Sequence, residues 1–532
     1  MAQNRRRFLQ QAAGAAVASM TPAAVFAAPS PRPSLARVRG GRVAGTYEGG
    51  VHVFRGLRYG ADTATRRFLP PVPEAAWRGV QDASEYGAAA PQRGEEGPGS
   101  EDCLFLNVWT PALRDGAARP VLVYLHGGGF STGSGSHPLY DGTRLCLRGD
   151  VVVVTLNHRL NAFGYLHLKD LLGPQYAASG NAGQLDLVQA LQWVRAHAAE
   201  FGGDPGNVTV FGQSGGGAKI ATLMAMPAAR GLFHRAWTMS GQQVTAAGPR
   251  AADGRARILL EALGIAPGDA QRLATVSADA LLQAQTVRDP SRVEDTALYL
   301  GPVMDGSTLP RHPFWPDAPP QSASIPMVIG NTRDETRAFL GGDPANFTLD
   351  WTTLPDRLRS QQYVDIDPDV VIAEYRCLYP DYTPSEIFFA ATTAGRSWRG
   401  AVEELEARAR DGHGNTWAYQ LDWYPHDVDP GGRLRAFHTL DIPLVFDNIA
   451  RHGSRTGTTA QAQRVADAMA EALLAFARSG DPRTGATADW SPYSLARRET
   501  MVFADPPRLG DDPRGGERRL YQRAPFVQRG TF

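Results

Sequence analysis

The chain has 532 residues, of which 43% are hydrophobic and 20% are charged, and these proportions are typical of globular proteins. Its 54 basic and 54 acidic side chains balance, so the sequence lacks the excess of basic residues that nucleic acid or an anionic membrane requires. No stretch of about 18 apolar residues occurs outside the N-terminus. We therefore expect no nucleic-acid partner and no stable membrane insertion. The three cysteines are too few for a disulfide framework and fit no zinc spacing.

The N-terminus has the pattern of an export signal. Arg5 and Arg6 precede Phe8 and Leu9, and a run of small, weakly apolar residues continues to Ala28. The paired arginines are typical of a twin-arginine signal. We predict a signal peptide over residues 1–28 and a single mature domain over residues 29–532, exported to the periplasm or secreted. A basic tail without a targeting role is the alternative.

From about residue 42, short apolar runs alternate with helical patterns, which indicates an α/β fold. An antiparallel hairpin is predicted over residues 42–59. Continuous β-branched runs at 121–125 and 151–156 are typical of strands buried on both faces. The remaining clear elements are strands at 208–211 and 327–329, a last main strand at 416–423, and helices at 183–200 and 461–478. The prediction is a large, mostly parallel central sheet flanked by helices, with the hairpin at its edge.

A candidate nucleophile follows the strand at 208–211. Gly212-Gln213-Ser214-Gly215-Gly216 fits the pattern G-x-S-x-G and precedes a helical stretch at 218–226. A tight turn from strand to helix strains the backbone at the serine and lifts its hydroxyl to the top of the sheet. The alternative, a phosphate-binding loop, would require G-x-x-x-x-G-K-[ST], which is absent. We therefore predict that Ser214 is a catalytic nucleophile.

A second glycine-rich loop follows the strand at 121–125. His126-Gly127-Gly128-Gly129-Phe130 offers backbone N–H groups that no side chain covers. The predicted oxyanion hole consists of the N–H groups of Gly128, Gly129 and Gly215. His126 could instead serve as the catalytic base, but we expect it to pack beneath the loop.

Over about residues 42–503 the chain resembles the type-B carboxylesterases, the cholinesterase-like branch of the α/β-hydrolases. The resemblance rests on the two glycine-rich loops and on several ordered blocks: Phe54-Arg-Gly-Leu-Arg-Tyr-Gly, Ser100-Glu-Asp-Cys-Leu-Phe-Leu-Asn-Val-Trp, Asn157-His-Arg-Leu, Gly180-Asn-Ala-Gly-Gln-Leu-Asp, Phe201-Gly-Gly-Asp-Pro and Pro302-Val-Met-Asp-Gly. It implies the α/β-hydrolase fold and the hydrolysis of small carboxylic esters without a metal or organic cofactor.

The resemblance also implies the remaining members of a Ser-acid-His triad. The acid is expected to be Glu335, after the strand at 327–329, with the adjacent Asp334 as the alternative. The histidine is expected to be His438, because His426 lacks the family's flanking pattern. Ser240 matches a family serine that lies near the triad. In this scheme His438 takes the proton of Ser214, and Glu335 holds the imidazole and stabilises its charge.

The chain departs from the family at three positions. Gln213 stands where the family often has glutamate, and Gly215 stands where it often has alanine. Many relatives pair the cysteine that corresponds to Cys103 with an upstream cysteine, which this chain lacks. A Cys103–Cys146 bond is the alternative disulfide.

The substrate pocket is expected to be lined by Phe130, Phe339 and the segments 280–320 and 345–400. Trp315, Trp351 and Trp398 fall in these two segments and could line a cleft, but the core is the more typical place for each. Two other functions stay open: a binding protein on the same fold, and cleavage of a thioester, lactone, carbamate or activated amide. No sequence pattern predicts an oligomeric state.

Overall fold

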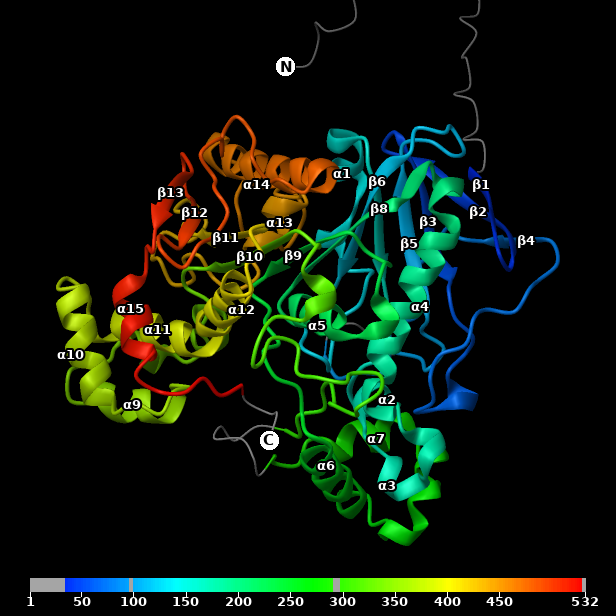
Figure 1. Cartoon of the computed structure of the whole chain (residues 1–532), viewed down its shortest axis with the longest axis horizontal. Coiled ribbons are helices and arrows are strands. Elements are labelled where there is room, and N and C mark those ends of the chain that lie inside the picture. Colours follow the sequence, from blue (N-terminus) through cyan, green and yellow to red (C-terminus); the bar gives the residue numbers. More distant parts are fainter. Residues whose placement is uncertain (1–33, 95–98, 290–296, 529–532) are drawn as a thin grey trace, which may run out of the picture. The chain divides into compact units, whose positions relative to one another are not determined.

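The computed structural model describes residues 34–94, 99–289 and 297–528, and the predicted signal peptide lies outside them. In the described residues, thirteen strands form one sheet (Figure 1). The strands are β1 (Ser34–Val38), β2 (Gly41–Glu48), β3 (Val51–Arg58), β4 (Val80–Asp82), β5 (Phe105–Thr110), β6 (Arg119–Leu125), β7 (Val152–Leu156), β8 (Gly203–Gln213), β9 (Arg235–Met239), β10 (Met327–Thr332), β11 (Thr416–Leu421), β12 (Glu499–Phe503) and β13 (Arg508–Asp511).

The strand order is β1-β2-β3-β5-β7-β6-β8-β9-β10-β11-β12-β13, and β4 pairs with β2. The strands from β7 to β12 are parallel, whereas β1, β2, β3 and β5 pair antiparallel at one edge and β13 pairs antiparallel at the other. The predicted hairpin is confirmed as β2 and β3, which pair in register from Thr46 opposite Val53.

Buried apolar side chains explain the middle of the sheet. All five residues of β7 are buried, and alternate residues of β6 point into two different apolar clusters. A strand that is covered on both faces needs this continuous run of β-branched residues. Because β6, β8 and β10 are parallel, their carboxyl ends lie at the same edge of the sheet. The predicted site residues follow the strands at this edge.

The helices are α1 (Thr143–Gly149), α2 (Asn161–Tyr165), α3 (Lys169–Leu172), α4 (Ala182–His197), α5 (Gly215–Ala225), α6 (Pro249–Ala262), α7 (Ala278–Ala284), α8 (Arg337–Leu340), α9 (Leu354–Gln361), α10 (Pro368–Leu378), α11 (Pro384–Thr393), α12 (Arg399–Arg410), α13 (Asp441–Val445), α14 (Ala460–Ser479) and α15 (Gly515–Tyr521). The residues between α11 and α12, Ala394–Trp398, form a π-helical turn. No helix in this described part is long and apolar enough to cross a bilayer.

The helices cover the sheet on both faces. One apolar cluster joins the sheet to α4, α5 and α12, and a second joins the opposite side chains of the same strands to α1, α13 and α14. In Figure 1, α14 and α13 lie on the other side of the sheet from α4 and α5. The predicted helices at 183–200 and 461–478 are confirmed as α4 and α14.

Several expectations need correction. The strand expected at 416–423 is present as β11, but β12 and β13 lie beyond it, so β11 is not the last strand. Cys103 and Cys146 are both buried and free, so the alternative disulfide is wrong. Trp315 and Trp351 are 56% and 45% exposed, so neither fills the core. The Arg376 guanidinium lies over the Trp351 ring at 4.6 Å and is a partner for the indole at the surface.

Candidate active site

Ser214 occupies a strained turn between β8 and α5. Its φ of 56° and ψ of −126° lie outside the regions that residues with a side chain normally adopt. The turn is fixed by a bond of 2.7 Å from the Ser214 backbone N–H to the carbonyl of Met239, on the neighbouring strand β9. Strain at this residue and partial exposure of its side chain are what a nucleophile at the top of a sheet requires.

The following glycines permit close packing beneath the turn. A Cβ atom on Gly216 would lie 1.9 Å from the carbonyl oxygen of Leu125, which is closer than two such atoms can approach. A Cβ atom on Gly215 would lie 2.1 Å from the carbonyl oxygen of Gly129. The serine turn and the glycine-rich loop after β6 are therefore in backbone contact.

Glu335 and His438 come together although 102 residues lie between them in the chain. Glu335 follows β10, is fully buried, and contacts Nδ1 of His438 through its Oε2 atom. Its other oxygen, Oε1, accepts hydrogen bonds from the Thr332 backbone at 3.0 Å and the Asn331 amide at 3.3 Å. These bonds hold the carboxylate so that it faces the imidazole.

The surroundings keep Glu335 ionised. Burial raises the pKa of its carboxyl, but the His438 charge, together with hydrogen bonds from His438, Ser240 and the Thr332 backbone, lowers that pKa below its ordinary value. Ser240 thus acts on Glu335, and its hydroxyl oxygen also accepts a bond of 3.3 Å from the Thr332 backbone N–H. An ionised carboxylate at Nδ1 orients the ring and favours a proton on that nitrogen.

The amide of Gln213 also lies against the His438 imidazole. The Nε2 atom of Gln213 lies 3.2 Å from Nε2 and 3.4 Å from Nδ1 of His438. Among the described residues, no hydrogen bond joins the Ser214 hydroxyl to His438. Catalytic hydrogen bonds often tighten only when substrate is bound.

The glycine-rich loop exposes backbone donors beside Ser214. Gly128 and Gly129 have φ values of 80° and 61°, the left-handed region that favours glycine. The Gly128 carbonyl accepts bonds from Ser131 and Thr132, which fold the loop back on itself. Within the described structure, the N–H groups of Gly128 and Gly129 donate no hydrogen bond, and that of Gly215 is at the first position of α5, where no helical partner exists.

A buried lysine supports this loop from below. Lys219, on α5, is fully buried and donates a bond of 2.9 Å from Nζ to the carbonyl oxygen of His126. Burial lowers the pKa of the Lys219 amine to about 7. His126 stacks on His158 with the ring centroids 4.8 Å apart, and burial lowers the pKa of both imidazoles well below the ordinary value. His126 therefore packs beneath the loop and does not face the nucleophile.

Asp334 and His426, the alternatives to Glu335 and His438, contact other residues instead. The Asp334 carboxylate pairs with Arg337 at 3.4 Å, and its backbone N–H bonds to Ala436. His426 is exposed and packs on Tyr424 with the ring centroids 4.2 Å apart. It is Glu335, rather than Asp334, that contacts His438. No group of three or more potential metal-ligating side chains occurs in the described ranges.

Two cavities lie near these residues. The first, of about 230 Å³, is lined by the Ser214 turn and by residues from distant segments: Gly129, Phe130, Ser214, Gly215, Ala218, Ser240, Gly241, Gln242, Gln243, Tyr299, Tyr363, Gly395, Arg396, Gly400, Phe526, Val527 and Gln528. Phe130 and the segments 280–320 and 345–400 contribute to the wall, as expected. Phe339 does not line it but packs on the His438 ring, with the centroids 4.8 Å apart. The contributions of Gln242, Gln243 and residues 526–528 were not predicted.

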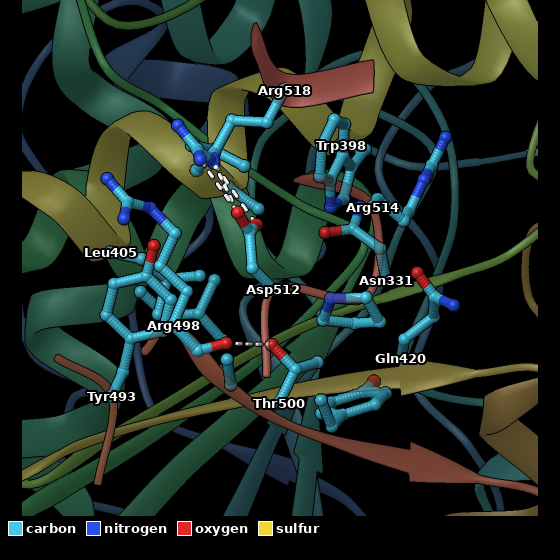
Figure 2. Close-up of a pocket in the computed structure, with 16 residues that line it drawn as sticks. Asn331, Trp398, Leu405, Gln420, Tyr493, Arg498, Thr500, Asp512, Arg514 and Arg518 are labelled. Atoms are coloured by element: carbon cyan, nitrogen blue, oxygen red, sulfur yellow. Dashed lines mark hydrogen bonds and ion pairs between the residues drawn. The ribbon is translucent and has the colours of Figure 1, made fainter. Parts of the chain in front are cut away.

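Figure 2 shows the second cavity, whose wall includes Asn331, Trp398, Arg514 and the ion pair between Arg518 and Asp512. Its volume of about 30 Å³ has room for one or two water molecules and for no ester. Trp398 therefore lines this small cavity and not the one at Ser214. The cavity around Ser214 is the candidate substrate site.

The sequence matches the carboxylesterase family over residues 30–517. It is 37% identical to the para-nitrobenzyl esterase of Bacillus subtilis (strain 168) over 496 residues, which cover 90% of this chain and 96% of that protein. It is 32% identical to the phenmedipham hydrolase of Pseudarthrobacter oxydans, over 88% of this chain and 95% of that protein. The structure is similar to that of the carboxylesterase EST55 of Geobacillus stearothermophilus, with a TM-score of 0.81, 38% identity and coverage of 92% of this chain and all of that one.

The fold is thus that of the α/β-hydrolases, as the resemblance implied. The chain belongs to the carboxylesterase family and is a carboxylic ester hydrolase.

Proposed function

We propose that the protein hydrolyses carboxylic esters through an acyl-enzyme intermediate on Ser214. The observation that carries this proposal is the contact between buried Glu335 and His438 beside a strained serine turn. Ser214, Glu335 and His438 act as the triad, and the N–H groups of Gly128, Gly129 and Gly215 form the oxyanion hole. Ser240 is a positioning residue, whose hydrogen bond adds to the larger effect of His438 in lowering the pKa of Glu335.

The reaction proceeds in two half-reactions. His438 accepts the proton of Ser214 as its oxygen attacks the ester carbonyl, and the three N–H groups bind the oxyanion that develops. The alcohol leaves with the proton from His438, so the ester bond breaks as the acyl-serine bond forms. Water, activated by the same imidazole, then releases the acid and restores the Ser214 hydroxyl. Glu335 stabilises the imidazolium in both halves.

We also propose that the chain is exported by its twin-arginine pattern. Arg5 and Arg6, followed by apolar residues and a small-residue run to Ala28, support cleavage near Ala27 or Ala28 and release to the periplasm or the medium. The free cysteines support folding before export, in a reducing compartment. Replacing both arginines by lysine is expected to leave the precursor uncleaved in the cytoplasm.

The test of the nucleophile is covalent labelling combined with kinetics. An organophosphonate probe should label the peptide that contains Ser214, and Ser214→Ala should lose both the label and about 10⁶-fold in kcat, because triad residues act as a unit. Ser240→Ala is the matched control, since it removes a hydroxyl from the same cavity and should still be labelled at Ser214. Label at another serine in the folded wild type would contradict the proposal.

A further inference from the structure

The cavity around Ser214 contains a single charged side chain among its described lining residues. That side chain is Arg396. The rest of the wall is glycine, apolar or aromatic side chains, and neutral polar groups that include the amides of Gln242, Gln243 and Gln528. Of the carboxyls behind this wall, Glu404 accepts a bond from the Gln243 backbone, and burial raises the pKa of Glu404 to about 8, so it is mostly neutral at pH 7. The carboxylate of Glu335, behind Ser240, contacts His438. Among the described lining residues, Arg396 is therefore the one charged side chain that a ligand in the cavity can contact.

The Arg396 side chain is held in place by two aromatic rings. Its guanidinium carbon lies 4.5 Å from the ring centroid of Phe339 and 4.8 Å from that of Tyr363. Its Nη1 atom donates a bond of 2.6 Å to the Tyr363 hydroxyl. Arg396 lies in the π-helical turn between α11 and α12, a type of irregularity that is frequent at functional sites. A planar fork fixed in this way loses little side-chain entropy when it binds a ligand.

Arg396 has no carboxylate partner among the described residues, whereas three of the buried arginines have one. Arg159, Arg255 and Arg514 are buried, and each pairs with a buried aspartate or glutamate. Arg396 forms no ion pair with any residue of the described ranges, and its hydrogen bond to Tyr363 uses one of five N–H donors. The remaining donors are available to an anion in the cavity.

Arg396 is also close to the reacting groups. The Phe339 ring that lies against its guanidinium also packs on the His438 imidazole, at 4.8 Å between centroids. The guanidinium is therefore one aromatic ring away from the catalytic base. A ligand that fills a cavity of about 230 Å³ and has its ester carbonyl at Ser214 can reach Arg396 with a second polar end.

We propose that Arg396 binds a carboxylate of the substrate, and that the substrate class is esters with a free carboxylate, such as half-esters of dicarboxylic acids. This inference rests on the proposed function, since the ester carbonyl must lie at Ser214. In the reaction, water cleaves the ester bond of the bound half-ester to give the alcohol, the dicarboxylate and one proton. The fork of the guanidinium matches the two oxygens of the free carboxylate.

The test compares esters that differ only in the charge of the distal group. Monoethyl half-esters from succinate to suberate are the anionic series, and the corresponding ω-amide ethyl esters are the neutral series of equal length. The readout is the ratio of kcat/KM for the anionic ester to that for its neutral amide. Arg396→Gln should lower this ratio by about 10- to 100-fold at the best chain length, and Arg396→Lys should recover part of the loss because it keeps the charge but not the fork.

Arg376→Gln is the matched control. Arg376 also lies over an aromatic ring, that of Trp351, but it does not line the cavity, so the ratio should not change. Raising the salt concentration should lower the wild-type ratio, because the attraction between the two charges is screened. A ratio that is the same in Arg396→Gln and wild type would overturn the inference.

A binding measurement separates this inference from the proposed function. In the Ser214→Ala protein, titration calorimetry with the half-esters does not depend on turnover. Binding that weakens by about 10-fold or more with Arg396→Gln would support the inference. Half-esters that bind no better than the neutral amides would overturn it, whereas Ser214-dependent hydrolysis of the neutral amide esters would still support the proposed function.

Discussion

At the scale of single residues, Lys219 is a group whose protonation is strongly affected by its place in the fold. It and Lys169 are the only lysines in a chain whose other basic side chains are arginines and histidines. Its amine is buried beneath the glycine-rich loop, and a single bond to the His126 carbonyl holds it there. A lysine can lose its charge at neutral pH, whereas an arginine cannot, so a lysine can occupy this site at a lower cost.

We expect Lys219 to make stability depend on pH. Its pKa is lowered from 10.5 to about 7, so the buried charge destabilises the folded protein fully below pH 7 and not at all above 10.5. From pH 7.5 to 10, the free energy of unfolding of the wild type should therefore rise relative to that of Lys219→Met, by up to about 1.4 kcal/mol per pH unit. Urea denaturation at several pH values measures the difference.

Lys169→Met is the control, because Lys169 is exposed and should give no such slope. If the difference in the free energy of unfolding between wild type and Lys219→Met stays constant over this pH range, the pKa of the Lys219 amine is not lowered in the folded protein.

The site residues that the sequence could predict are those embedded in glycine-rich or strand-flanking motifs. Ser214 and Gly128 belong to such motifs, and the positions of Glu335 and His438 came from the family resemblance alone. Arg396 could not be predicted, because its role depends on Phe339 and Tyr363, which are distant in the chain and have no regular spacing. The Gln213 amide beside His438 depends on a side-chain orientation that sequence does not specify.

At the scale of elements, the turn after β8 and the loop after β6 control each other's position. The resemblance implies that alanine is common in the family at position 215, yet here a methyl group on Gly215 would lie 2.1 Å from the Gly129 carbonyl. The loop in this chain therefore lies closer to α5 than an alanine would permit. Gly129 must move if Gly215 is replaced by a residue with a side chain.

We expect Gly215→Ala to lower kcat by about 10-fold or more, approaching the 10²- to 10³-fold cost of losing one oxyanion donor. The reason is that displacement of Gly129 moves its N–H away from the oxyanion. Steady-state kinetics on a neutral ester gives the value.

The matched control is Gly254→Ala, on α6, where a methyl group meets no atom within 4 Å. That variant should keep its kcat and gain slightly in helix stability. An unchanged kcat in Gly215→Ala would mean that the loop adjusts without loss of the oxyanion hole.

The elements themselves differ in how far sequence predicts them. The strands β6 and β7 are buried on both faces, and their unbroken β-branched runs are unmistakable. The strand β12 is short, has a glutamate at its start, and forms by pairing with β11 and β13, so its pattern alone does not identify it. The helices from α6 to α12 connect to the sheet through long irregular segments, where local patterns carry little information.

At the scale of the whole molecule, a buried ion network joins helix α15 to the loop that carries Glu335, the proposed triad acid. Glu517, on α15, is fully buried and bonds to Arg514, Arg333, Tyr375 and Tyr379. Burial raises the pKa of Glu517, but the charges of Arg514 and Arg333 lower it by more, to about 2. Arg333 lies two residues before Glu335, so α15 helps to hold the acid loop in place.

We expect Glu517→Gln to lower the free energy of unfolding by about 3–5 kcal/mol at pH 7, because Arg514 would be left as a buried charge without its partner. The stability that the lowered pKa contributes is present above about pH 4.5 and is lost as the pH falls toward 2, so the gap between wild type and variant should shrink in that window. Urea denaturation at pH 7 and at pH 3.5 measures both effects.

An exposed ion pair on a neighbouring helix is the control. Glu374→Gln, on α10, breaks the surface pair with Arg523 at 3.4 Å and should change stability by about 0.5 kcal/mol or less. Equal changes in the free energy of unfolding for the two substitutions would show that the buried network stabilises the fold no more than a surface ion pair does.

The wall of the substrate cavity ends in Phe526, Val527 and Gln528, which belong to the last part of the chain that the structure describes. Gln528 is tied to the wall by accepting bonds from the backbone of Val244 and Thr245. Replacing Gln528 by alanine would therefore loosen part of this wall without touching Ser214, Glu335 or His438. Such a protein would keep one turnover chemistry and differ from the wild type in which esters it prefers.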